Sequence, residues 1–128
     1  MSRRDARDVA FKLIFAYTFD NEKNVEALEE YVSNMDKDDK SYVFEVYNGV
    51  TTKFNELKQM ISENAEKFDV DRIFKVDFAI LSLAVYEIQY MQSIPYKVSV
   101  DEALNLAHKY STEKSAKYIN GILSKFSR

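Results

Sequence analysis

Cysteine is absent from this sequence, and histidine occurs once, at His108. The lack of cysteine excludes disulfides, thiolate metal sites and cysteine nucleophiles, and it is compatible with a reducing compartment. A single histidine excludes a histidine-rich metal site, and we interpret it as a surface or partly buried side chain. There is also no phosphate-binding glycine loop, HExxH motif or nucleophile elbow. We therefore expect neither an enzyme nor a bound cofactor or metal ion.

Glycine and proline are scarce, with two glycines and one proline among 128 residues. So few turn-forming residues argue against a many-stranded sheet and predict an all-α fold. We expect a single domain over residues 1–128 with about seven helices, arranged as two small three-helix bundles that share a central packing region. The N-terminal bundle would span about residues 1–68 and the C-terminal bundle about residues 69–128.

Long hydrophobic runs are also missing, and none is long enough to span a bilayer. The N-terminal sequence MSRRDARD carries charges where a signal peptide would need an apolar centre. We therefore expect a cytoplasmic protein without membrane contact.

The net charge of −3 argues against binding nucleic acid by bulk electrostatics, but the charges are unevenly distributed. Residues 1–12 carry four basic and two acidic side chains, and residues 109–128 carry five basic and one acidic. Residues 20–40 carry eight acidic and three basic side chains. This asymmetry permits a local phosphate-binding patch on an acidic protein.

Apolar residues recur at helical spacing along most of the chain. The charged segment MDKDDK is expected to be a loop, and Asp69 or Asp71 is expected to cap a short turn. Pro95 ends the helix before it, and Ser99 with Glu102 predicts a capping box for the next one. The predicted helices cover about residues 3–19, 24–34, 41–68, 76–91, 99–110 and 112–126.

The last predicted helix has one apolar and one basic face. Tyr118 falls at the boundary between them. A glycine inside a helix costs about 1 kcal/mol relative to alanine, so Gly121 indicates close approach of a ligand or tight packing against a helix, with equal weight. A lysine stripe is usually a solvated face, so by itself it does not establish a site. The basic face comprises Lys114, Lys117, Gly121, Lys125 and Arg128.

Two further groups of charged residues are candidates for functional sites. Arg3, Arg4 and Arg7 lie at the positive end of the first helix dipole, where cations are unfavourable, so they either serve a phosphate or form a solvated terminus. Asp77 and Glu87 interrupt the apolar helix at residues 76–91. Each acid is interpreted as a surface position, a buried ion-pair partner or a docking residue.

Taken together, these segments resemble the NusB family of bacterial transcription antitermination factors over nearly the whole chain. RRDARDVAFKLIFAY is similar to the arginine-rich first helix of that family. AILSLAVYEI, IPYKVSVDEALNLAHKY and KYINGIL resemble its long central helix, the helix after the proline and its last helix, in the same order. The stretch from the proline to the Asn-Gly pair is the most specific part.

The resemblance implies a fold of two three-helix bundles that binds boxA RNA of nascent ribosomal RNA transcripts. Binding would occur together with NusE, a small-subunit ribosomal protein, within an RNA polymerase antitermination complex. The implied NusE contacts are Phe15 and Asp77. The implied RNA contacts are Arg3, Arg4, Arg7, Lys117, Tyr118 and Asn120, to which the basic stripe adds Lys114.

The chain departs from the family pattern at four of the matched positions. Asp5 stands where another basic residue is common, and Lys114 replaces a residue that is frequently acidic. Phe15 lacks the hydroxyl of the common tyrosine, and Ser124 stands in place of a common aspartate. Asp5 lowers the positive charge of the N-terminal basic patch, whereas Lys114 and Ser124 make the last helix more basic.

Two other hypotheses are compatible with parts of the sequence. One is a protein-interaction module, such as a homodimer, whose apolar surface pairs with another chain while the basic ends stay solvated. The other is a fragment of a ribosomal RNA methyltransferase that carries a NusB-like domain. We expect a complete chain without a cofactor-binding domain, and this argues against a methyltransferase fragment.

Overall fold

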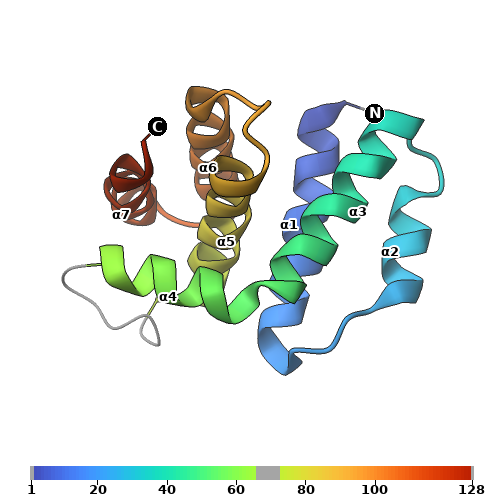
Figure 1. The fold of residues 1–128 in the computed structure, drawn as a ribbon, viewed down its shortest axis with the longest axis horizontal. Helices are drawn as coiled ribbons and strands as arrows, with labels where there is room; N and C mark the ends of the chain where they lie inside the picture. The colour runs from blue at the N-terminus through green and yellow to red at the C-terminus, as the bar shows by residue number, and fades with distance from the viewer. Residues whose placement is uncertain (1, 66–72, 128) are drawn as a thin grey trace.

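The computed structural model describes residues 2–65 and 73–127, which form seven α-helices and one 3₁₀ turn with no strand. The all-α prediction is therefore confirmed. Figure 1 shows α1, α2 and α3 packed together on one side and α5, α6 and α7 on the other, with α4 reaching beneath the second group. The elements are α1 (Arg3–Asp20), α2 (Val25–Val32), α3 (Lys37–Thr52), α4 (Phe54–Asn64), α5 (Lys75–Tyr90), α6 (Tyr96–Tyr110), α7 (Glu113–Leu123) and η2 (Ser124–Phe126).

Side-chain caps determine where several helices begin. Ser2 and Asp5 form a capping box at the start of α1, and Asn24 caps α2. Asp36 accepts a hydrogen bond from the Asp39 amide over 2.9 Å, so α3 begins at Lys37. The prediction that MDKDDK is a loop was wrong, because its first aspartate caps a helix whose first turn is acidic and suits the helix dipole.

The single helix predicted for residues 41–68 is in fact two helices, α3 and α4, which meet at Lys53. Just before this break, the Thr51 hydroxyl donates to the carbonyl oxygens of Tyr47 and Asn48, a local bond that bends helices. The change of direction brings the fully buried Leu57 of α4 into the core. Residues 66–72, with the expected cap at Asp69 or Asp71, lie outside the described residues.

The helix after the proline begins earlier than the capping box predicts. Pro95 itself is the N-cap, and α6 starts at Tyr96. Proline suits this end because its missing amide hydrogen would have no helical partner. Ser99 is therefore inside the helix and buried, where its hydroxyl donates to Glu87 over 2.8 Å. The predicted capping box was wrong, and Glu102 is free to contact another helix.

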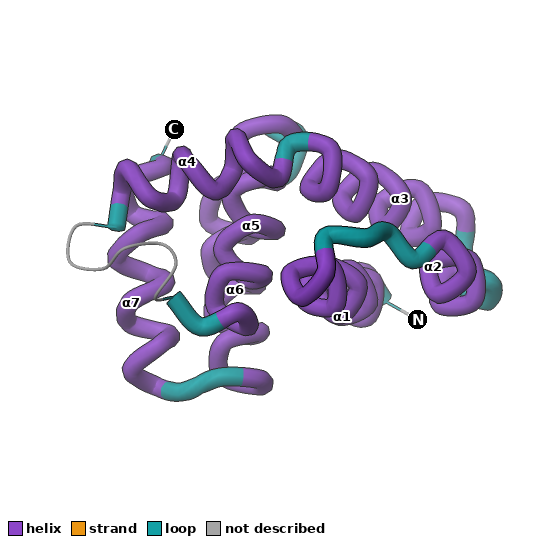
Figure 2. Tube along the Cα trace, turned by 90° about the horizontal axis from the view of Figure 1, so that it is seen from below, coloured by secondary structure: helices purple, strands orange, loops and turns teal. Residues whose placement is uncertain are grey.

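α5 is the central helix, and every residue from Asp77 to Ile88 is buried. Figure 2 shows it, with α6, between α1 on one side and α7 on the other. Gly49 on α3 allows the Tyr86 ring of α5 to pack directly over the helix backbone, since an added Cβ would lie 2.2 Å from the ring. None of the described helices is long and apolar enough to cross a membrane.

Candidate functional site

Arg7 is buried at the centre of the molecule, with 4% of its surface accessible. Its guanidinium donates to both carboxylate oxygens of Glu87, from Nε over 2.8 Å and from Nη2 over 3.1 Å. The hydroxyls of Tyr42 and Ser99 donate to the same carboxylate. We call these four side chains the central polar cluster. It joins α1, α3, α5 and α6, and it identifies Glu87 as a buried ion-pair partner.

Charge complementarity stabilises the central polar cluster in its ionised form. Burial alone would lower the pKa of Arg7, but the hydrogen bond and charge of Glu87 raise it above its ordinary value. Burial and the same carboxylate raise the pKa of Tyr42 well above its ordinary value, so its hydroxyl keeps the proton that it donates. The expected contact of Arg7 with a phosphate has no support in this geometry, because the guanidinium is enclosed and already paired.

Arg3 and Arg4 are exposed at the start of α1, and each is held by a carboxylate from another helix. Arg3 Nε donates to Asp39 Oδ1 of α3 over 2.9 Å. Arg4 donates from Nε and Nη2 to the two oxygens of Glu102 on α6, over 3.1 Å and 2.9 Å. Hydrogen bonding to Arg4 holds the pKa of Glu102 below its ordinary value. These pairs neutralise the charge of both arginines.

The exposed basic face that the sequence predicted lies on α7 and continues to Lys125 in η2, while Arg128, also assigned to it, lies outside the described residues. Lys114, Lys117 and Asn120 are exposed, whereas Tyr118 is half-buried and burial raises the pKa of its phenol. Within residues 2–65 and 73–127, neither Lys114 nor Lys117 is in an ion pair. A Cβ at Gly121 would meet no described atom within 4 Å, so tight helix packing does not explain this glycine.

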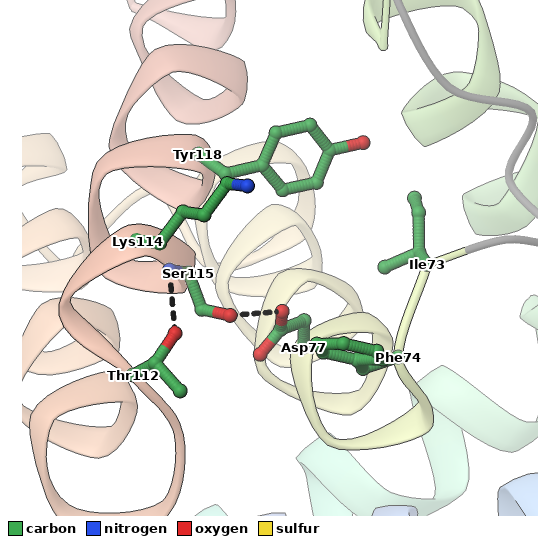
Figure 3. Close-up of a pocket in the computed structure, with 7 residues that line it drawn as sticks. All are labelled: Ile73, Phe74, Asp77, Thr112, Lys114, Ser115 and Tyr118. Atoms are coloured by element: carbon green, nitrogen blue, oxygen red, sulfur yellow. Dashed lines mark hydrogen bonds between the residues drawn. The ribbon is translucent and has the colours of Figure 1, made fainter.

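A pocket of about 240 Å³ opens beside this face, between the start of α5 and α7. Figure 3 shows Lys114 and Tyr118 on the α7 side of the pocket and Ile73 and Phe74 on the side that leads into α5. The lining residues are Ile73, Phe74, Asp77, Thr112, Lys114, Ser115 and Tyr118.

Asp77 is buried in the wall of the pocket, with 3% of its surface accessible. Its two carboxylate oxygens accept hydrogen bonds from the hydroxyls of Ser111 and Ser115, over 2.7 Å and 2.6 Å. The surface interpretation is therefore wrong for Asp77, as it is for Glu87. Asp77 differs from Glu87 in being held by two hydroxyl donors, with no cation paired to it among the described residues.

Exposed phenylalanines lie near the pocket, where the end of α1 meets the start of α5. Phe19 and Phe74 are 62% and 67% exposed. Phe15 packs edge-on against Phe19 with ring centres 5.1 Å apart. Lys75 ties the two helices together, because its Nζ donates to the Thr18 carbonyl over 3.2 Å and lies 5.3 Å from the Phe19 ring centre. We call Phe15, Phe19 and Phe74 the aromatic surface.

The structure brings together only some of the residues that the sequence singled out. Asp77, Lys114 and Tyr118 share the pocket, and Phe15 lies in the nearby aromatic surface. The N-terminal arginines are elsewhere, because α5 and α6 lie between α1 and α7 (Figure 2). The two basic chain ends therefore do not form one continuous patch.

Sequence reasoning missed several residues of these surfaces. Phe74 precedes the apolar helix α5, and Lys75 is its first residue. Only the packing of α1 beside α5 shows that Phe74 belongs to the aromatic surface and that Lys75 contacts it. Glu102 was assigned to a helix cap, and Asp39 to a loop, although both hold arginines distant in sequence. On α3, three acidic residues against two lysines were the available signal, whereas α6 carries two acidic residues and two lysines and gives no such signal.

The fold and these surfaces define a small helical protein with two packed bundles, a basic helix face and an adjoining pocket. A family model described as the NusB family matches residues 4–128. The chain belongs to the NusB family.

Curated relatives with the name "Transcription antitermination protein NusB" are similar over nearly their full length. The protein of Clostridium novyi (strain NT) is 37% identical over 127 residues, which cover 96% of each chain. That of Clostridium botulinum (strain Hall) is 39% identical over 141 aligned positions, covering 98% of this chain and 99% of the relative.

Solved structures show the same fold. NusB of T. maritima superposes with a TM-score of 0.90 at 32% identity, covering 99% of this chain and 91% of the other. A chain from the crystal structure of antitermination factors NusB and NusE in complex with dsRNA superposes with a TM-score of 0.85 at 26% identity. That match covers 97% of this chain and 94% of the other.

Proposed function

We propose that this NusB-family protein is a transcription antitermination factor that binds boxA-type single-stranded RNA of nascent ribosomal RNA transcripts together with NusE. It would act within the RNA polymerase antitermination complex. The observation that carries the proposal is the exposed basic face of α7 beside a pocket and an aromatic surface. The similarity to a chain from a complex of NusB and NusE with dsRNA supports NusE as a partner and RNA as a class of ligand.

The proposed RNA site lies on α7. Lys114 and Lys117 are exposed and would contact phosphates. Tyr118 presents a half-buried ring at the pocket for base stacking, and the exposed Asn120 amide would read base edges. Single-stranded RNA is commonly bound by this combination of phosphate contact and aromatic stacking.

Arg3 and Arg4 form a second proposed group of RNA contacts. They are exposed, but they lie on the far side of α6 from α7, so a strand that reaches both groups would cross the exposed face of α6. Arg7 contributes indirectly in this proposal, because its pairing with Glu87 holds α1 in position.

The proposed NusE site is the aromatic surface with the adjoining pocket. Exposed aromatic side chains are typical of protein contacts. Phe19 and Phe74 expose large apolar rings to solvent, and contact with a partner would bury them. Phe15 would contribute apolar area without a hydroxyl. Asp77 would act through the pocket wall, where its charge faces an incoming side chain.

The RNA proposal is tested by fluorescence-anisotropy titration of a labelled boxA RNA and a scrambled RNA, with and without NusE, at two salt concentrations. We expect a preference for boxA that NusE enhances and that salt weakens, since phosphate contacts release counterions. Equal, salt-insensitive binding of both RNAs would refute sequence-specific RNA binding.

Lys117→Ala locates the RNA site. Loss of one phosphate contact is expected to weaken binding at low salt and to reduce the slope of log K against log salt by about 0.7. Lys23→Ala, which removes an exposed lysine from the segment between α1 and α2, away from α6 and α7, is the matched control. Equal effects of the two substitutions would remove α7 from the proposed site.

Asp77→Asn tests the partner site. Asparagine keeps the size of the side chain and one acceptor for the serine hydroxyls, whereas lysine would place an ammonium group in a buried position. We expect weaker NusE binding by isothermal titration calorimetry with little change in RNA binding by the isolated protein. Asp101→Asn on α6 is the control, and unchanged NusE affinity in both variants would exclude Asp77 from the interface.

The aromatic surface also favours a second candidate, in which two copies of this chain associate through it. Analytical ultracentrifugation of the wild type and of Phe19→Ser distinguishes the two. A dimer that dissociates on substitution supports self-association, whereas a monomer in both cases leaves the surface available to NusE.

A further inference from the structure

The first two arginines of α1 are each matched by a carboxylate from a different helix, although they belong to the proposed RNA site. Asp39 of α3 holds Arg3, and Glu102 of α6 holds Arg4. The residue that follows them on the same side, Arg7, is paired with Glu87. The arginine-rich end of α1 therefore carries almost no net charge, in contrast to the basic face of α7.

The contact between Arg4 and Glu102 is the one most open to exchange. The Arg4 side chain is 70% exposed, whereas the Glu102 side chain is 13% exposed. The carboxylate thus lies against the protein, where Asn105 also donates to it over 3.2 Å, and the guanidinium covers it from the solvent side. A ligand from solvent reaches Arg4 without having to displace any other element.

The geometry of this contact is the one that a phosphate would use. Glu102 takes two parallel N–H donors of Arg4, from Nε and Nη2, with its two oxygens. Guanidinium groups bind carboxylates and phosphates in the same forked arrangement. A phosphate that approaches Arg4 finds the Nε and Nη2 donors already occupied by Glu102. If it approaches the other edge of the guanidinium, the negative charge of Glu102 on the far side of the group weakens the attraction.

We propose that Glu102 competes with RNA phosphates for Arg4, so that Arg4 adds little to RNA affinity until the RNA displaces this carboxylate. The inference rests on the proposed RNA-binding function and specifies how that site is regulated. Glu102 stays ionised at neutral pH, since Arg4 holds its pKa below the ordinary value. In this chain, affinity at low RNA concentration would therefore come mainly from α7.

The test compares boxA RNA affinity and its salt dependence for the wild type and Glu102→Gln. Glutamine keeps the shape of the side chain and removes the competing charge. We expect RNA binding about threefold to tenfold tighter at low salt. We also expect a slope of log K against log salt that is steeper by about 0.7, because Arg4 then neutralises one more phosphate and releases the counterion of that phosphate from the RNA.

Two control variants separate competition from a change in net charge. Asp101→Asn removes one charge from the same helix, where Asp101 contacts only Lys97 at 3.6 Å among the described residues, and it should give a much smaller gain. In the background of Arg4→Ala, Glu102→Gln should give no gain, because the contested guanidinium is absent. Circular dichroism confirms that each variant is folded.

The possible outcomes separate this inference from the proposed function. Weaker or unchanged binding by Glu102→Gln, an equal gain in Asp101→Asn, or a gain that survives in Arg4→Ala would overturn the competition while RNA binding stands. Absence of boxA binding by the wild type with NusE present, and by every variant, would overturn the proposed function and this inference with it.

Discussion

Replacing Arg7 by alanine tests whether the central polar cluster stabilises the fold. The substitution leaves the Glu87 carboxylate fully buried, with hydroxyl donors from Tyr42 and Ser99 but without its cation. Loss of one partner of a buried ion pair costs about 3–5 kcal/mol. Because two hydroxyls still solvate the carboxylate, we expect the lower end, about 3 kcal/mol, out of a total stability of about 5–15 kcal/mol.

The assay is urea unfolding followed by circular dichroism at 222 nm, with the denaturant slope fitted for each variant. Arg4→Ala is the matched control, since it removes an exposed arginine from the same helix and should leave the midpoint almost unchanged. Replacing the pair by Arg7→Met with Glu87→Leu should recover only part of the lost stability, because no buried charge remains but the hydroxyls of Tyr42 and Ser99 lose their acceptor.

A loss below about 1 kcal/mol for Arg7→Ala would refute this reasoning, since it would mean that Glu87 is hydrated or protonated without cost. A loss of about 3 kcal/mol has a consequence for RNA binding. Weaker binding by Arg7→Ala would then be explained by loss of the contact that holds α1 in position, so the substitution cannot by itself place Arg7 at an RNA contact.

Three smaller predictions concern packing and pH. Gly49→Ala should cost about 1–3 kcal/mol, because the new Cβ would meet the Tyr86 ring at 2.2 Å. Gly121→Ala, whose Cβ would meet no described atom within 4 Å, should instead stabilise the protein by up to about 1 kcal/mol; thermal melts that shift the same way in both variants would contradict the two together. Burial acts to raise the pKa of Asp8, but hydrogen bonds from Tyr110 and two lysines lower it overall. Asp8 therefore stabilises the fold above the ordinary carboxyl pKa of about 4, and this contribution is lost as pH falls through the lower folded-state value. Asp8→Asn should reduce stability at pH 7 and flatten its decline in acid, and parallel pH profiles for the two proteins would contradict this.

Local chemistry was sufficient for most of the helices. α1, α2 and α5 begin and end within about two residues of their predicted bounds, and α7 does so together with the 3₁₀ turn η2 that follows it. Periodic apolar positions and flanking caps act within a few residues of each other, so they locate these ends. The errors arose where two local signals competed. Asp36 was counted as part of a charged loop although it caps α3, and Ser99 was counted as a cap although Pro95 already starts α6.

The candidate site was predictable on α7, where the basic and apolar faces follow from a single helical period. The roles of the arginines were not, because each depends on an acid 36, 98 or 80 positions away in sequence. A chain with 21 acidic residues contains no local sign of which ones will face Arg3, Arg4 or Arg7. The position of Asp77 in a pocket wall likewise depended on the packing of α7 against α5.

Periodicity and the scarcity of glycine and proline were enough to predict a helical protein, and the resemblance of the segment from Pro95 to Gly121 to the NusB family predicted its type, since each of these is a property of neighbouring residues. Tertiary packing alone decided which charges are available to a ligand. Ion pairing and burial depend on side chains that folding brings together from distant segments, so Arg7 became part of the core, Arg4 was paired with Glu102, and Lys117 stayed exposed to solvent.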